Sequence, residues 1–520
     1  MQRRDVLTGA LAGMLLPLLV ACGGEKSGGT VRIQMPLPDD LDPAALQSDL
    51  DAQLAVHVYS GLVTLNDKGE PIPDLAQRWS LSPDGRTYLF PLRPGLRFHN
   101  GEQLAAEHIK DTWEHLLDPQ FESPSAQEFL GNIVGVAPYR NKIAGDISGI
   151  RAVNTRTLEI DLAEPDLTFP AKLTHPATYV QAPAGIKGGT SQIGSGPFTV
   201  AAWVPGEALT LVRSEDYYGF APLLDRIEIT GGIDGQSLGR YAGDALDILY
   251  VGANDIAAVW DRNNPLHKDL VVLDALEMTF LAMNNRTPPF DDEGVRQAFA
   301  LAIDRAAIVE QVFSQTVGRA TSLLPPSLAR NGNAETVAFD IFKARQALGD
   351  SRYRDVNNLP EVTFTVPGTR SPPPSEVLAL INMIQQHLGV RIRIQRESYS
   401  TFVENLDRRA NPYQLFLFTW RAEYPDPQAV LDPLFRSSSV SNYSSYRSPD
   451  VDALLLQARG EHDSGRRRQT LAEIEQRIAT DSPVTPLWHG KSYVLVKPWV
   501  RDVQLSATAR PWLNRVHLSS

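Results

Sequence analysis

The chain has 520 residues, of which 42% are hydrophobic and 21% are charged. This length exceeds what one hydrophobic core supports, so we expect two or three domains of ordinary globular composition. The formal net charge of -12 argues against nucleic acid or an anionic membrane surface as a partner, and it favours cationic or zwitterionic ligands.

The N-terminus has the pattern of a bacterial lipoprotein signal. A basic start and an apolar stretch precede the segment LVAC at 19–22, which matches the lipobox, where the signal is cut before a cysteine that becomes lipidated. Cys22 is the only cysteine, so neither an intramolecular disulfide nor a cysteine metal site can form. The alternative is an ordinary secretory signal that is cut elsewhere and leaves a free thiol.

These features predict a location in the bacterial cell envelope. We expect residues 1–21 to be a signal peptide and residues 22–30 to be a lipidated, glycine-rich tether. No later stretch approaches the roughly 18 apolar residues of a membrane-spanning helix. The mature protein should therefore be a periplasmic lipoprotein, held at the membrane by its N-terminal lipid and not embedded in it.

The first half of the chain predicts mixed α and β structure. Apolar residues at helical spacing indicate helices over 50–59 and 104–117, and alternating or apolar runs indicate strands. The expected strands cover 31–33, 87–92, 198–203, 209–213, 227–230 and 246–250. The segments 198–203 and 209–213 are expected to pair as a hairpin.

The second half predicts a partly parallel sheet. A strand over 279–284 is followed by Asp292, which can cap one long helix with an apolar stripe from Val295 to Phe313. Strands over 362–366 and 390–394 enclose a helix over 376–387, which is a β-α-β unit. Two helices over 449–459 and 464–480 and a strand over 484–496 complete this part. No long linker is present, so we expect domains between which the chain crosses several times.

The stretch from Leu415 to Phe435 is where we expect the function to lie. The apolar run 415–420 predicts a strand buried on both faces, and Glu423 lies just beyond its end. Ligands of open α/β sheets tend to bind at the carboxyl ends of strands, so a carboxylate between Trp420 and Tyr424 can hold a cation. The alternative is a solvated loop acid before a turn.

This stretch resembles the W-x-x-D-Y-P-D-P segment of the oligopeptide- and dipeptide-binding lipoproteins that serve peptide-type ABC importers. Trp420, Tyr424 and residues 425–427 fit that segment. Glu423 stands where the family has an aspartate that receives the α-amino group of a peptide. Segments similar to the family's F-H-x-G and G-S-G-P-F motifs occur at 98–101 and 194–198.

The resemblance implies an α/β fold with two hinged lobes that close over the ligand, built on mixed sheets, and a third, smaller α+β domain. It implies lobe I over 31–70, 186–277 and 495–520, the accessory domain over 71–185 and lobe II over 278–494. Peptide-binding members hold the ligand backbone as an added strand. The implied ligand-binding residues of this chain are Gln47, Ser48, Asp49, Ser125, Thr419, Trp420, Arg421, Glu423, Tyr424, Trp488 and His489.

The implied function is non-enzymatic capture of a peptide-like solute by a monomer that delivers it to an ABC transporter permease. No cofactor, metal or nucleic acid is expected. Ser125 replaces a family tyrosine near the ligand amine, and no basic group for a peptide carboxylate can be identified. A non-peptide solute, such as a metal chelate, an opine or a haem-like compound, is therefore an alternative.

Two further sequence patterns could be functional motifs or ordinary structural features. Residues 235–239 match the G-x-S-x-G motif of serine hydrolases, but Ser237 is expected to begin a helix over 238–246 and does not follow a strand directly. An extracytoplasmic hydrolase thus remains a distant alternative. The basic run 466–468 lies beside acidic residues and predicts a solvated helix face.

We predict that Cys22→Ser releases the protein from membranes, because cleavage signal, tether and cysteine converge on one anchor. Stable anchoring needs more than one acyl chain, so loss of the lipidated cysteine should shift most of the protein to the soluble fraction. Cell fractionation measures this. Equal amounts of wild type and variant in the membrane pellet would show that the lipoprotein prediction is wrong.

Overall fold

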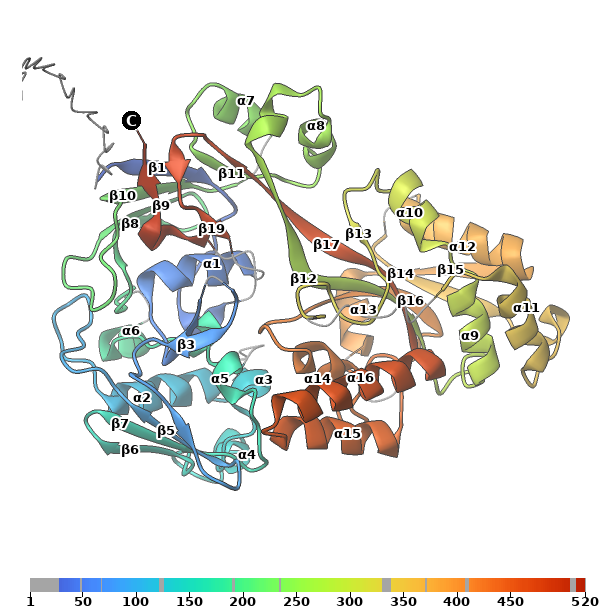
Figure 1. The fold of residues 1–520 in the computed structure, drawn as a ribbon, viewed down its shortest axis with the longest axis horizontal. Coiled ribbons are helices and arrows are strands. Elements are labelled where there is room, and N and C mark those ends of the chain that lie inside the picture. The colour runs from blue at the N-terminus through green and yellow to red at the C-terminus, as the bar shows by residue number, and fades with distance from the viewer. Residues whose placement is uncertain are drawn as a thin grey trace, which may run out of the picture.

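The computed structural model describes residues 28–46, 49–66, 68–120, 126–188, 192–232, 235–329, 338–369, 372–406, 411–505 and 511–519. Two bodies stand side by side, and the long strands β12 (Leu270–Met283) and β17 (Val484–Val496) run from one into the other (Figure 1). An accessory unit extends the first body toward the helices of the second. This arrangement confirms the predicted two-lobe α/β fold with a smaller third domain.

One large sheet passes through both bodies. Its order is β15-β14-β16-β12-β17-β11-β1-β10-β9-β8, and β13 pairs with β17 beside this path. The other strands of this sheet are β1 (Thr30–Gln34), β8 (Phe198–Val204), β9 (Ala208–Arg213), β10 (Arg226–Thr230), β11 (Ile248–Tyr250), β13 (Gly318–Arg319), β14 (Val362–Pro367), β15 (Ile392–Glu397) and β16 (Leu415–Arg421). β1 is parallel to β10 and β11, and β14 is parallel to β15 and β16, whereas β12 and β17 are antiparallel to their neighbours. The predicted parallel β-α-β unit and the hairpin β8-β9 are confirmed.

The accessory unit is built on a separate antiparallel sheet of order β4-β5-β7-β6. Its elements are β4 (Ser80–Leu81), β5 (Thr87–Pro91), β6 (Ile150–Asn154), β7 (Thr157–Asp161), α2 (Ala106–Leu117), α3 (Ala126–Leu130), α4 (Val136–Arg140) and α5 (Phe169–Lys172). Trp113 of α2 is fully buried, and its indole N–H donates a hydrogen bond of 2.9 Å to the carbonyl of Thr178. That bond satisfies the one polar atom of a large core side chain.

The remaining elements of lobe I surround the first half of the large sheet. They are α1 (Asp49–Val58), β2 (Val63–Leu65), β3 (Pro71–Pro73), α6 (Pro183–Gly188), α7 (Ser237–Ala242), α8 (Ile256–Trp260), β18 (Val500–Arg501), β19 (Gln504–Leu505), β20 (Pro511–Trp512) and β21 (His517–Leu518). α7 is shorter than the helix that the sequence predicts, because it already ends at Gly243, whose N–H bonds back to the carbonyls of Gly239 and Tyr241.

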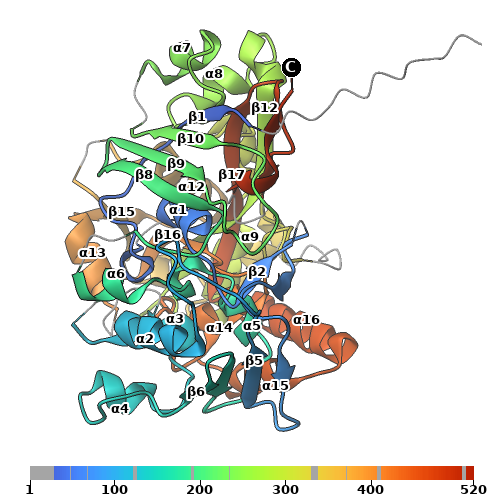
Figure 2. The same ribbon diagram turned by 90° about the vertical axis from the view of Figure 1, so that its left-hand side faces the viewer.

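Lobe II carries most of its helices around the other half of the sheet. They are α9 (Glu293–Leu301), α10 (Arg305–Gln311), α11 (Ile341–Asp350), α12 (Ser375–Leu388), α13 (Tyr399–Leu406), α14 (Gln428–Phe435), α15 (Pro449–Gly460) and α16 (Ser464–Asp481). In both views α14, α15 and α16 lie at the same end of the molecule as the accessory unit (Figures 1 and 2). The accessory unit therefore faces lobe II as well as lobe I.

The segment after Asp292, predicted as a single helix, forms two helices in the structure. Asp292 caps α9 as expected, since its carboxylate accepts from the N–H of Val295 at 3.2 Å. The helix stops at Leu301, and a second one, α10, begins after Asp304, whose carboxylate accepts from the N–H of Ala307 at 3.0 Å. A second capping aspartate divides the apolar stripe between two helices, because its side chain satisfies the N–H groups that open a new helix.

β12 is much longer than the predicted strand, and its length explains how the lobes are joined. Its first residues pair with the end of β17 next to β11, and its last residues pair with β16 inside lobe II. The predicted lobe boundaries after residues 277 and 494 fall within β12 and β17. Those boundaries stay predictions, and the two strands belong to both lobes.

We predict that Phe280→Ala lowers the free energy of unfolding by about 3–5 kcal/mol, the usual cost of deleting a buried aromatic ring. Phe280 of β12 is fully buried and stacks on Phe418 of β16 with ring centroids 5.1 Å apart. Phe342→Ala is the control, because this ring on α11 is 87% exposed and its loss should cost less than about 0.5 kcal/mol. Urea denaturation measures both, and equal losses would contradict the placement of Phe280 in the core.

Candidate functional site

The register of three strands aligns four of the residues predicted from the sequence. On β12, Thr279 pairs with Thr419 of β16 on one side and with Trp488 of β17 on the other. Met278, the preceding residue, pairs in the same way with Trp420 and His489. Neighbouring strands lie about 4.8 Å apart, so each row spans roughly 10 Å across the sheet.

The side chains of β16 are already engaged within lobe II. Thr419 is exposed, and its hydroxyl lies 2.9 Å from that of Thr279. Arg421 donates from Nη2 to Glu277 across the strand pair at 2.6 Å. The indole N–H of Trp420 donates to the carbonyl of Ala429 in α14 at 2.8 Å, which ties the strand to the helix after the Pro-Asp-Pro turn.

Trp488 and His489 are buried in the sheet. The ring of Trp488 lies 4.7 Å from that of Phe313, within the apolar core of lobe II. His489 is 3% exposed, and burial lowers its pKa to about 4. Neither residue lines the cavity described below, so their predicted contact with a ligand stays a prediction.

Glu423 lies two residues beyond the end of β16, as predicted, and is half-buried. Its Oε2 lies 3.2 Å from Nε2 of His175, a residue of the accessory unit. Nδ1 of His175 accepts a hydrogen bond from the N–H of Ala177, which places the imidazole proton of the neutral ring on Nε2. The histidine therefore donates to the carboxylate that the sequence predicts as the ligand anchor.

A buried lysine of the accessory unit lies against Tyr424, the residue after Glu423. Lys172 of α5 donates to Asp166 at 2.6 Å, and its ammonium lies 5.8 Å from the ring centroid of Tyr424. Burial alone would raise the pKa of Asp166, but Lys172 and the hydroxyl of Thr168 outweigh it and lower this pKa. Tyr424, 3% exposed, is thus packed against a cation of the accessory unit.

Glu128 of α3 is a second carboxylate near Glu423. Burial, and then the negative charge of Glu423, raise the pKa of Glu128 to about 7, although Lys172 acts in the opposite direction. The next residue, Phe129, stacks on the ring of His175 with centroids 4.5 Å apart. The accessory unit therefore brings an acid, an imidazole and a lysine to the end of β16.

The contact between the accessory unit and lobe II extends further along the same line. Glu164 lies 3.4 Å from both Arg436 and Arg459, and the N–H of Leu167 donates to the carbonyl of Arg459 at 2.8 Å. Arg459 also donates to Asp432 of α14 at 2.6 Å. We call this boundary, formed by residues 164–175 against residues 423–436 and 459–460, the seam.

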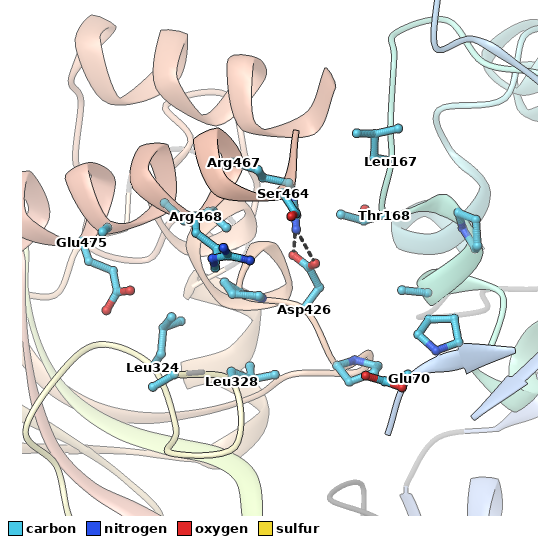
Figure 3. A pocket seen from close by; sticks show the side chains of 18 of the residues that line it. Glu70, Leu167, Thr168, Leu324, Leu328, Asp426, Ser464, Arg467, Arg468 and Glu475 are labelled. Atoms are coloured by element: carbon cyan, nitrogen blue, oxygen red, sulfur yellow. Dashed lines mark hydrogen bonds and ion pairs between the residues drawn. The ribbon is translucent and has the colours of Figure 1, made fainter. Parts of the chain in front are cut away.

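A cavity of about 570 Å³ opens beside the seam, between the accessory unit and α16 (Figure 3). Its lining comes from five separate parts of the chain and is largely apolar. The lining residues are Glu70, Pro71, Trp79, Leu81, Tyr88, Leu167, Thr168, Pro170, Ala171, Leu324, Leu328, Ala329, Pro425, Asp426, Pro427, Ser464, Arg467, Arg468, Leu471, Ala472 and Glu475. Solute sites are concave and mostly apolar with a few polar groups, and this cavity has that composition.

The Pro-Asp-Pro turn is fixed by an arginine of α16. Arg467 donates to both carboxylate oxygens of Asp426, at 2.7 and 2.9 Å, and to the amide oxygen of Gln428. Such a two-pronged pair sets geometry as well as charge. The prediction that residues 466–468 form a solvated face is therefore wrong for Arg467, which is half-buried because it braces the turn.

The structure brings some of the predicted site residues together and leaves others apart. Glu423, Tyr424 and Trp420 surround the end of β16, whereas Trp488 and His489 lie within the sheet. Gln47, Ser48 and Ser125 lie outside the described residues, as does the side chain of Asp49 at the start of α1. Their predicted roles stay predictions.

Sequence reasoning missed the contribution of the accessory unit. His175, Lys172 and Glu128 carry no local motif, because each gains its role from a contact with a distant part of the chain. Lys172 and His175 both lie just before Pro176, and this spacing does not indicate a functional site in the sequence. Within the described ranges, no group of three or more His, Cys, Asp or Glu side chains could hold a metal ion, and no helix is long and apolar enough to cross a bilayer.

We predict that Glu128→Gln removes part of the pH dependence of stability. The pKa of Glu128 is raised from 4.5 to about 7, so between these values the unfolded state holds fewer protons and stability falls as pH rises. The variant should gain on the order of 1 kcal/mol relative to wild type between pH 4 and pH 8, allowing for partial exposure. Denaturation at several pH values, with the exposed Glu107→Gln as control, measures this; parallel curves for wild type and Glu128→Gln would contradict it.

Comparison with known proteins places the chain in a family. Residues 70–442 match the model of bacterial extracellular solute-binding proteins, family 5 Middle. The dipeptide-binding protein DppE of Bacillus subtilis is 25% identical over 485 residues, covering 90% of this chain and 87% of the relative. The probable deoxycholate-binding periplasmic protein YgiS of Escherichia coli is 27% identical over 487 residues, covering 89% of this chain and 88% of the relative.

The fold is similar to solved structures over nearly its whole length. Clavulanic acid biosynthesis oligopeptide binding protein 2 superposes with a TM-score of 0.84 at 20% identity, covering 95% of this chain and 96% of that one. The family match spans more than half of the chain and agrees with the resemblance that the sequence motifs indicate. This chain belongs to the bacterial extracellular solute-binding proteins of family 5.

Proposed function

We propose that this protein captures a peptide-like solute between its two lobes and delivers it to the permease of an ABC importer. The relative named a dipeptide-binding protein supports a peptide-like ligand. We further propose that the protein acts as a monomer in the periplasm, anchored through Cys22. That residue lies outside the described ranges, so the anchor rests on the lipobox in the sequence.

The observation that carries the proposal is the carboxylate of Glu423 at the boundary between lobe II and the accessory unit. It follows a central strand of lobe II and contacts His175 of the accessory unit at 3.2 Å. A solute ammonium at this point would meet a half-buried carboxylate and would share it with His175 or displace that contact. A hydrogen bond between an ammonium and a carboxylate is strengthened by both charges, so this carboxylate suits a cationic group of a solute.

A non-peptide solute is the second proposal. The cavity beside the seam is walled by apolar side chains such as Trp79, Leu328 and Leu471, and the relative named as a probable deoxycholate-binding protein suggests a bulky amphipathic ligand. Hydrolysis at Ser237 has less support. This serine is 1% exposed at the start of α7, whereas a nucleophile must reach its substrate.

We predict that Glu423→Gln weakens binding of peptides with a free N-terminus by about two to three decades, because it keeps the shape of the side chain and removes its charge. Acetylation of the peptide amine should weaken binding to wild type comparably. The two changes together should cost much less than their sum, since each removes the same ion pair. Isothermal titration calorimetry on the four combinations measures the coupling.

Ser237→Ala is the control variant for this experiment, and we expect its peptide affinity to equal that of wild type. Binding should also raise the melting temperature of both proteins. At a peptide concentration of a hundred times the dissociation constant, the free energy of unfolding should increase by about 2.7 kcal/mol. Equal affinity of wild type for free and acetylated peptides would contradict the role of Glu423 and favour the non-peptide solute.

A further inference from the structure

Three consecutive arginines at the start of α16 have different surroundings. Arg466 donates to both carboxylate oxygens of Glu461, at 2.9 and 3.0 Å. Arg467 is held by Asp426, as described above. Arg468, within the part of the chain that the structure describes, has neither a hydrogen bond nor an ion pair, and it lines the cavity. Two of the three cations are thus neutralised by the protein itself, whereas Arg468 is exposed and its side chain has no counter-charge among the described residues.

The other charged side chains that line the cavity either contact a partner within the protein or are partly neutral. Asp426 is neutralised by Arg467, and Glu70 accepts a hydrogen bond from the side-chain amide of Asn66 at 3.0 Å. Glu475 is 7% exposed, and burial raises its pKa to about 7, so it is only partly ionised at neutral pH. Arg468 is therefore the cation of this lining that has no described counter-charge.

Arg468 lies at one end of an apolar surface. On α16, residues 468, 471, 472 and 475 follow the spacing of one helix face, and all four line the cavity. Figure 3 shows Arg468 between Arg467 and Glu475 on this face, with Leu324 and Leu328 below it. The rise of 1.5 Å per residue separates positions 468 and 475 by about 10 Å. The cation thus stands beside a surface long enough for a small peptide.

The facing wall comes from the accessory unit. Trp79, Leu81 and Tyr88 belong to or precede its sheet, and Leu167 and Pro170 belong to the segment that forms the seam. Apolar surface on both sides and one arginine between them match a solute with an apolar body and an anionic group. Such a solute would bury its side chains while its charge remains hydrogen-bonded.

We propose that this cavity is a subsite for the solute and that Arg468 binds its anionic group, a carboxylate in a peptide-like ligand. This deepens the proposed function and rests on it. A guanidinium presents a planar fork of donors that matches a carboxylate with two parallel hydrogen bonds, which an ammonium cannot do. The accessory unit then takes part in recognition, because it supplies the wall opposite Arg468.

The test is calorimetry of the full-length protein with the tripeptide Ala-Phe-Ala and with its C-terminal amide. Arg468→Gln should weaken binding of the free acid by about 10- to 100-fold, the usual effect of losing hydrogen bonds to a charged group. Amidation should weaken binding to wild type by a similar factor, and it should have little further effect on the variant. Arg468→Lys keeps the charge without the fork, so an intermediate loss is expected.

Arg466→Gln is the matched control, since it removes an arginine of the same helix turn that does not line the cavity. It should leave both affinities unchanged. Two results would overturn the subsite proposal and leave the proposed function standing. Arg468→Gln could bind the free acid with the affinity of wild type, or it could lose affinity for the free acid and for the amide by the same factor. Failure of wild type to bind either peptide would overturn the proposed function and this inference with it.

Discussion

Contacts along the seam hold the accessory unit against lobe II. Glu164 meets two arginines of lobe II, Lys172 is placed by Asp166 against Tyr424, and His175 donates to Glu423. The pair of Lys172 and Asp166 lies within the accessory unit, whereas the other contacts join that unit to lobe II. Lys172 and Asp166 are both buried, so removal of either would leave an uncompensated charge inside the accessory unit. Glu164 is 43% exposed, so its ion pairs across the seam contribute less.

The long strands β12 and β17 give the two lobes a common element. They pair with each other over most of their length, and each also pairs with strands of the lobe at its end. Hinged proteins close by small backbone changes at a few positions in such connections. The irregular pairing between Asp274 and Met278 lies where β12 leaves lobe I, so bending there requires no break in a regular ladder.

Local patterns in the sequence predict the elements well, and contacts between distant segments are what they miss. The apolar run of β16, the spacing of α12 and the parallel β14-β15 pair follow from residue patterns that also hold in the structure. Asp304 shows the limit, since a second capping residue inside one apolar stripe divides a helix. Glu423 could be proposed as a site residue from the sequence because it follows a predicted strand. His175 and Arg468 could not, because their surroundings are formed by segments that are distant in the sequence.

Hydrogen–deuterium exchange of the full-length protein, with and without saturating Ala-Phe-Ala, tests most directly whether a solute is held at Glu423 and in the cavity beside the seam. We expect slower exchange on both sides of the seam, in residues 164–175 and 423–436, and in the first turns of α16. These segments surround Glu423 and the cavity. A bound peptide that leaves exchange unchanged in both seam segments, or slows it on one side alone, would contradict the account.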